Sequence, residues 1–178
     1  MELQSFMVQL VEKNGGEVAG RVRLQKIIYF CKALGADIEP NYKLYIYGPF
    51  SQQVADTLQD CVVEDILMEE NGLIQRGMEF NTYLESVTDS EDPSMKILMD
   101  VLDLCKTLST KQLEIDATTF FIDRQQKILF GCEDEKDVIK KVIHAKGNRF
   151  TEDEIKKSYQ RVEQKCFPLV KKYAVVGQ

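Results

Sequence analysis

The sequence predicts an α+β protein that is mainly helical and has two parts. Residues 1–90 are expected to form a winged helix-turn-helix-like domain with a small hairpin wing, and residues 91–178 an all-helical subdomain. Three observations carry this prediction. Apolar residues recur at helical spacing along most of the chain, an Asn-Gly pair marks a hairpin in the first part, and capping signals begin the helices of the second part.

Three helices are predicted in the first part. Their apolar stripes cover residues 3–11, 24–34 and 54–62. Glycines are expected to end the first two helices, and Ser51 is the expected N-cap of the third. Between the second and third helices, the short aromatic run Leu44–Tyr47 predicts a strand that Gly48-Pro49 breaks.

The hairpin follows the third helix. Asn71 and Gly72 separate the short apolar runs Ile66–Met68 and Leu73-Ile74, and both turn residues tolerate positive φ. A second extended piece is predicted from Glu79 to Val87. Helix, helix, strand, helix and hairpin is the order of elements in a winged helix, which is the basis of the prediction for this part.

The second part is predicted to be helical throughout. The polar, proline-containing stretch 88–94 is expected to be a linker. Three capping signals follow, at Asp92-Pro93, Ser109-x-x-Gln112 and Thr151-x-x-Glu154. Pro168 is expected to end the last helix.

Composition bounds the class of protein. The chain of 178 residues is 44% hydrophobic, so it can bury a core, and its net charge is −6. No run reaches the roughly 18 apolar residues of a membrane span, and no secretory signal is recognised at the start, so we expect a cytoplasmic protein with no membrane association. The first ninety residues carry a net charge of −7, which opposes binding of a phosphate backbone.

Neither a metal site nor a cofactor is predicted. The five cysteines are widely spaced without a Cys-x-x-Cys pair, and His144 is the single histidine. We therefore expect buried thiols in a reducing compartment.

No enzyme is predicted either. The sequence contains no phosphate-binding glycine loop and no hydrolase motif, and it offers His144 no orienting partner. An enzyme would need a pocket in which carboxylates or Tyr29 meet.

The third helix is an unfavourable reading helix for DNA. Its predicted span, Ser51–Asp60, has two aspartates and no Lys or Arg, and the expected wing is also acidic. DNA-binding proteins gain much of their affinity by neutralising phosphates. A nucleic-acid surface, if one exists, must use cations elsewhere: Arg21, Arg23, Lys140, Lys141, Lys146, Arg149, Lys156 and Lys157. A solvated helix face is the favoured interpretation of these residues, and a docking surface is the alternative.

Tyrosines gather before the Gly-Pro pair. Tyr45 and Tyr47 would share one face of a strand, and tyrosine is enriched at protein interfaces. We expect at least one of Tyr42, Tyr45 and Tyr47 to pack in the core, and another to serve an interface, with a homodimer as one alternative.

Two segments carry a family resemblance. Leu24–Phe30 (LQKIIYF) and Tyr45–Ser51 (YIYGPFS) resemble the "LQKLLYF … YGPx" pattern of the SocA/Panacea antitoxin-like domains, and more closely the uncharacterised YwgA-like proteins of bacteria and archaea. Leu113–Thr118 resembles the "LE-x-x-AT" helix of the YwgA-like group, and Phe150–Ile155 resembles its late segment. Tyr45 stands where Panacea domains usually have Trp.

The resemblance implies a role in binding another protein. Panacea-like domains are associated with antitoxins that neutralise a toxin and with adaptors that deliver a partner to a protease. The fold-defining or partner-binding positions are Leu24, Gln25, Lys26, Tyr29, Tyr45, Tyr47, Gly48 and Pro49. We thus expect a non-enzymatic protein-interaction module that binds through its winged-helix-like domain. The alternative is a DNA-binding transcription regulator that uses basic residues outside the third helix.

Overall fold

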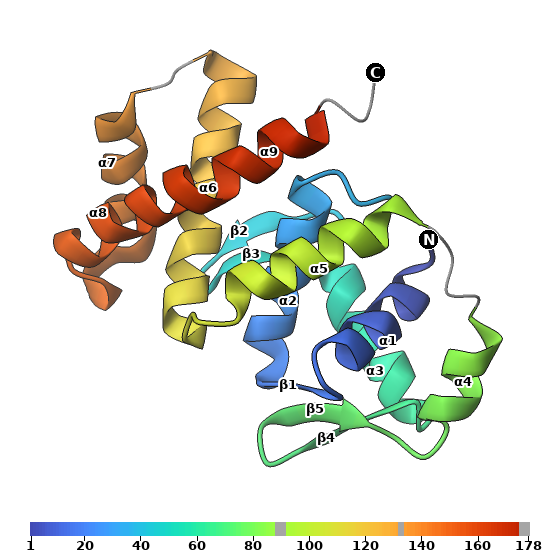
Figure 1. Cartoon of the computed structure of the whole chain (residues 1–178). Helices are drawn as coiled ribbons and strands as arrows, with labels where there is room; N and C mark the ends of the chain where they lie inside the picture. The colour runs from blue at the N-terminus through green and yellow to red at the C-terminus, as the bar shows by residue number, and fades with distance from the viewer. Residues whose placement is uncertain (88–91, 132–133, 175–178) are drawn as a thin grey trace. The chain divides into compact units, whose positions relative to one another are not determined.

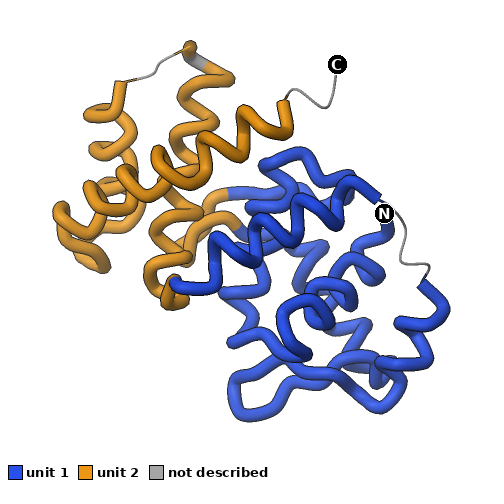
Figure 2. Tube along the Cα trace, in the orientation of Figure 1, with its two compact units in different colours: residues 1–43, 50–107 blue, residues 44–49, 108–178 orange. Residues whose placement is uncertain are grey.

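The computed structural model describes residues 1–87, 92–131 and 134–174. The protein is mainly helical with small antiparallel sheets, and it forms two compact units (Figures 1 and 2). The first unit comprises residues 1–43 and 50–107, and the second comprises residues 44–49 and 108–178. The chain therefore enters the second unit briefly at 44–49, returns to the first, and leaves it again after residue 107.

The first unit contains five helices and a three-stranded sheet among its described residues. The helices are α1 (Leu3–Lys13), α2 (Gly20–Ala33), α3 (Gln52–Val63), α4 (Phe80–Ser86) and α5 (Pro93–Cys105). The strands β1 (Glu17–Val18), β5 (Leu73–Arg76) and β4 (Leu67–Glu70) lie side by side in that order, all antiparallel. The apolar stripes predicted for the first three helices form the core, which includes the fully buried Phe6, Leu10, Ile27 and Leu58.

The predicted hairpin is confirmed. Glu70 pairs with Leu73 across the turn, where Asn71 and Gly72 have φ of +52° and +78°. Gly77 closes the base of the hairpin and donates its amide to the Ile66 carbonyl at 2.9 Å. A Cβ at Gly77 would lie only 2.0 Å from the carbonyl oxygen of Asp65, so this close approach requires glycine.

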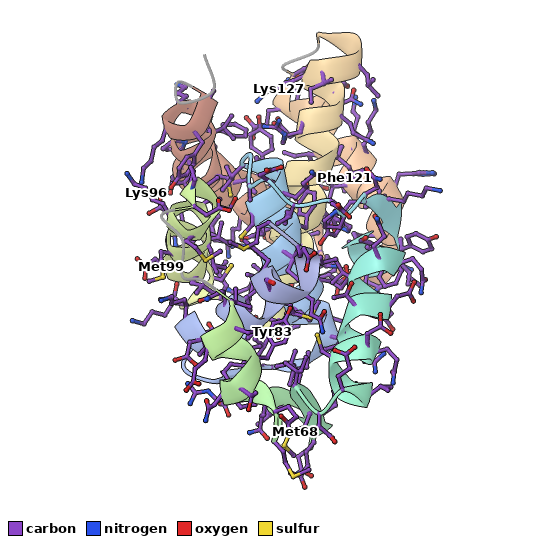
Figure 3. The ribbon with its side chains drawn as sticks, turned by 90° about the vertical axis from the view of Figure 1, so that its right-hand side faces the viewer. Met68, Tyr83, Lys96, Met99, Phe121 and Lys127 are labelled. Atoms are coloured by element: carbon purple, nitrogen blue, oxygen red, sulfur yellow. The ribbon has the colours of Figure 1, made fainter. Side chains whose placement is uncertain are left out.

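The extended piece predicted from Glu79 to Val87 is wrong, because this segment forms the helix α4. Phe80 is buried, and Tyr83, one helical turn later, places its hydroxyl 3.2 Å from that of Ser5 on α1 (Figure 3). The spacing of three between these aromatic residues fits one face of a helix. A strand would send them to opposite faces.

The segment around Gly48 also differs from the prediction. The strand predicted over 44–47 is replaced by a pair of short strands, β2 (Lys43–Tyr45) and β3 (Gly48–Phe50). Gly48-Pro49 therefore begins a strand and does not break one. Tyr47 lies in the turn between the strands, so it does not share a strand face with Tyr45.

The second unit is helical apart from residues 44–49. Its helices are α6 (Thr110–Phe130), α7 (Glu135–Lys146), α8 (Glu152–Arg161) and α9 (Phe167–Ala174). A short 3₁₀ turn, Gly147–Arg149, follows α7, and a π-helical turn, Val162–Cys166, joins α8 to α9. Both capping boxes, at the starts of α6 and α8, are confirmed.

Pro168 does not end the last helical segment. It lies near the start of α9, directly after the π turn, and the helix continues to Ala174. The helical run is continuous from Glu152 to Ala174, and the π turn widens it just before the proline, whose ring would otherwise clash with the preceding turn.

The compact units do not coincide with the predicted division between residues 90 and 91. The helix α5 packs against α2 within the first unit, where Arg23 Nη2 donates to the Cys105 carbonyl at 2.8 Å. The predicted N-cap at Asp92 is confirmed, with its carboxylate accepting from the Ser94 amide at 2.8 Å. Most of the predicted linker, residues 88–91, lies outside the described residues.

Among the helices of the described residues, each is too short or too polar to cross a bilayer. Four cysteines, Cys31, Cys61, Cys105 and Cys166, are buried free thiols, as predicted, and Cys132 lies outside the described residues. Burial raises the pKa of Cys31 well above its ordinary value, and it raises that of Cys61 to about 12.

We predict that Cys61 of the native protein does not react with iodoacetamide. At about pH 8, a thiol with a pKa of about 12 is almost entirely protonated, and only the thiolate is nucleophilic. Peptide mass spectrometry after labelling measures the modification, with protein unfolded in urea as the control. Alkylation of Cys61 at the same rate in both states would contradict the burial described here.

Candidate functional site

The LQK segment of α2 lies in the interior of the first unit. The four residues that the resemblance marks here, Leu24, Gln25, Lys26 and Tyr29, are each 5% exposed or less. They therefore define the fold and do not present a surface to a partner.

Gln25 holds the backbone of Ser51 with both ends of its amide. Its Nε2 donates to the Ser51 carbonyl at 2.9 Å, and its Oε1 accepts from the Ser51 amide at 3.1 Å. Ser51 occupies the N-cap position of α3, but its hydroxyl makes no capping bond and has no partner among the described residues. The predicted side-chain cap is thus wrong, because Gln25 fixes the start of α3 through the backbone of Ser51.

Tyr42 is the tyrosine that packs inward. Its hydroxyl donates to the Gln25 carbonyl at 3.3 Å, and its ring meets that of Tyr29 edge-on with centroids 5.2 Å apart. Burial raises the pKa of Tyr42 well above its ordinary value. These contacts join the LQK helix to the residues immediately before β2.

A buried carboxylate organises the second unit. Glu114 of α6 is nearly inaccessible, and its two oxygens accept from Lys146 Nζ at 2.7 Å and from Arg149 Nη2 at 3.1 Å. The Lys146 side chain is also almost fully buried, and this desolvation lowers its pKa while the Glu114 carboxylate opposes the shift. Two cations therefore share one buried anion.

The same two cations bind the backbone of the β2–β3 turn. Lys146 Nζ donates to the Ile46 carbonyl at 3.1 Å, and Arg149 Nη1 donates to it at 3.3 Å. The Arg149 guanidinium also stacks on the Tyr47 ring, 4.4 Å from its centroid. Charged donors make stronger hydrogen bonds than neutral ones, so this turn is firmly anchored.

The side chains of this turn are exposed although its backbone is held. We call residues Leu44–Tyr47 the aromatic turn. Their exposed fractions are 36%, 57%, 65% and 52% in chain order, whereas the following Gly48 and Pro49 are buried. Of the resemblance positions, Tyr45 and Tyr47 are therefore the accessible ones. The residues of this turn fall within the second unit (Figure 2).

An open groove of about 360 Å³ includes Leu44 of the aromatic turn. It is lined by Leu44, Ile122, Gln125, Gln126, Lys140, Lys141, His144 and Ala145. His144 is exposed here. Tyr29 is buried in the first unit, whereas His144 belongs to the second.

Buried carboxylates of the second unit are matched by cations. Arg161 binds Asp116 through both oxygens at 2.9 and 2.6 Å, and Lys127 lies 3.0 Å from Asp123. Among the described residues, no three His, Cys, Asp or Glu side chains converge as a metal site requires. The carboxylates that the structure gathers therefore serve ion pairs.

Several predicted nucleic-acid contacts are engaged within the protein. The prediction that Lys146 is a surface contact is wrong, because its side chain is buried in an ion pair with Glu114. Arg21 pairs with Glu69 and Lys156 with Glu152, while Arg23 and Arg149 bind backbone carbonyls. Lys141 donates to Gln126, and Lys140 lies 3.9 Å from Asp137. Lys157 lines a second pocket together with Phe150 and Arg161.

The exposed face of α3 is acidic and amide-rich, as the sequence predicts. Gln52 donates to Asp56 at 2.8 Å, and Gln53 accepts from the Asn41 amide at 2.8 Å. Both glutamines thus already have partners, and the helix presents no cation.

No family model matches the chain. The chain is 23% identical over 158 residues to the "Uncharacterized protein YwgA" of Bacillus subtilis (strain 168), and this match covers 86% of the chain and 91% of that relative. The match spans both compact units and supports the YwgA-like resemblance. The relation to SocA/Panacea domains stays a prediction.

We predict that Gln25→Ala lowers the free energy of unfolding by about 1–3 kcal/mol, because it leaves the buried amide of Ser51 without its partner. The Ser51 carbonyl loses one of two bonds and keeps the one from the Ala55 amide. Urea denaturation followed by circular dichroism measures the loss of stability. The matched control is Gln52→Ala on the surface of α3, which is expected to change stability little. Equal effects of the two substitutions would show that the Ser51 contact is unimportant.

We predict that Glu114→Gln destabilises the protein by about 3–5 kcal/mol, because it leaves Lys146 buried without a counter-charge. Adding Lys146→Met is expected to recover part of this loss. The double mutant should therefore lose less unfolding free energy than the two single mutants lose together. Glu152→Gln, which breaks an exposed pair with Lys156, is the control with little expected effect. Additive losses would contradict a shared buried network.

Proposed function

We propose that the protein is a non-enzymatic protein-interaction module, antitoxin-like or adaptor-like, and that the aromatic turn is its docking element. The observation that carries this proposal is the contrast within the turn. Four consecutive large apolar side chains, Leu44–Tyr47, are exposed, while Lys146 and Arg149 hold the backbone beneath them.

Exposure of this kind has an energetic cost that a partner would remove. Burying an aromatic side chain is favourable by an amount that scales with its apolar area. A segment that is already fixed loses little conformational entropy on binding, so more of that gain appears as affinity. Tyrosine and arginine are also frequent among the residues that dominate binding energy, and Arg149 stacks on Tyr47 in this turn.

We infer a winged-helix-like fold for the first part of the chain. This is supported by the order α1, β1, α2, α3 and the β4–β5 hairpin, with β1 beside β5 in the sheet. The aromatic turn would then be an insertion between the second and third helices of that fold. The β4–β5 hairpin would be the wing, and it carries Glu69 and Glu70.

Protein binding is favoured over DNA binding by the charges that remain accessible. The third helix offers no cation, and Lys146 is committed to a buried ion pair. A DNA-binding regulator would depend on Lys140, Lys141 and Lys157 for its phosphate contacts. Arg21 and Lys156 could add to these, because their ion pairs are exposed and weak, but α3 would still contribute no cation. The partner class that the family resemblance suggests is a toxin or a protease-type protein.

We predict that Tyr45→Ala removes a stoichiometric protein partner captured by the tagged protein from a lysate of its native host. The affinity of the purified pair is expected to fall about tenfold or more, which is the usual scale for an interface tyrosine. The control is Val63→Ala at the end of α3, which removes a smaller and more exposed apolar side chain from the other unit.

Two results would contradict this proposal. One is a partner retained equally by both variants. The other is nucleic acid that co-purifies at moderate salt and dissociates steeply as salt rises, without any protein partner.

A further inference from the structure

The groove that includes Leu44 has two kinds of lining. Its apolar part comes from Leu44 of the aromatic turn, Ile122 of α6 and Ala145 of α7. Its polar part comes from α7, where Lys140 and Lys141 precede His144 by about one helical turn. The lining residues include no carboxylate, so the groove combines an apolar floor with a basic wall.

The basic wall remains able to bind a ligand. Lys140 is exposed, and it forms an ion pair with Asp137 on the same helix. Its Nζ lies 3.9 Å from Oδ1 of Asp137. An exposed pair of this kind is weak and exchanges readily. Lys141 donates to the buried Gln126, and both residues line the groove.

We propose that this groove binds a short acidic segment of the partner protein. An aliphatic side chain of that segment packs against Leu44, Ile122 and Ala145, and carboxylates beside it reach Lys140 and Lys141. This inference rests on the proposed function and names the chemistry of the partner. Leu44 belongs to both the groove and the aromatic turn, so the two surfaces meet at this residue.

A peptide fits this lining better than a nucleic acid does. A polyanion is held by many cations along a backbone track, whereas two lysines flank an apolar floor here. The volume of about 360 Å³ lies at the small end of ligand sites, which suits one or two side chains.

The test is a ¹⁵N–¹H NMR titration of the full chain with four probes. The first is the capped peptide Glu-Asp-Leu-Leu-Glu-Asp, and the second replaces both leucines with glycine. The third replaces the acidic residues with lysine, and the fourth is a single-stranded oligonucleotide of comparable charge. We expect the first probe to shift amides of α7 and of Leu44, with about fivefold weaker binding of the glycine peptide.

Charge reversal provides the matched variants. Lys140→Glu with Lys141→Glu is expected to weaken binding of the first peptide about tenfold or more. Lys156→Glu with Lys157→Glu makes the same change in net charge on α8 and is expected to leave binding unchanged. The dispersion of the NMR spectrum shows directly whether each variant is folded.

Three results would overturn the groove proposal: no shifts up to about 5 mM peptide, equal binding of the glycine peptide or the oligonucleotide, or equal effects of the two charge reversals. Its failure is distinguishable from failure of the proposed function. If Tyr45→Ala abolishes partner capture but the Lys140/Lys141 charge reversal does not, docking by the aromatic turn is supported and binding in the groove is contradicted. If the charge reversal abolishes capture and Tyr45→Ala does not, docking by the aromatic turn is contradicted and binding in the groove is supported.

Discussion

One buried carboxylate, that of Glu114, joins three parts of the second unit. A carboxylate removed from water must be matched by cations and hydrogen bonds, and Glu114 has both in Lys146 and Arg149. Those cations retain further donor capacity, which they direct to the Ile46 carbonyl, one hundred residues or more away along the chain. One charged cluster therefore fixes the start of α6, the end of α7 and the aromatic turn together.

In the first unit an uncharged side chain likewise fixes a distant piece of backbone through hydrogen bonds. The Gln25 amide matches the peptide group of Ser51, as a neighbouring strand would, and it fixes the chain where α3 begins. The segment between these two anchors contains Gly48 and Pro49. A long-range side chain thus holds the backbone on each side of the Gly-Pro pair, within the unit to which each belongs. This gives a physical reason for the pairing of an LQK helix with a Tyr-Gly-Pro segment.

Local chemistry explains which features the sequence could predict. Helical stripes, the Asn71-Gly72 turn and the capping boxes depend on neighbours a few residues apart, and all are present. The helix α4 was missed because a seven-residue segment offers only three apolar positions, Phe80, Tyr83 and Leu84, which is less than one full repeat of the helical pattern. The partners of the anchors were missed because they are distant in sequence: local periodicity can place a side chain inside, but it does not identify the group that the side chain meets.

Lys146 is the instructive case at the candidate site. It ends a run of lysines, which favours the interpretation of a basic surface. Yet Val138, Val142 and Lys146 follow one another at intervals of four, and the first two form the buried face of α7. Helical periodicity alone therefore places Lys146 inside, and a buried lysine needs an anion. The acidic residue within the apolar start of α6, Glu114, was the available signal. Lys146 and Arg149 are used inside this unit and do not form a surface for a polyanion. The features that stay exposed are the aromatic turn and the two lysines Lys140 and Lys141. We therefore propose a partner with both apolar and acidic side chains, because neither feature alone would discriminate so well.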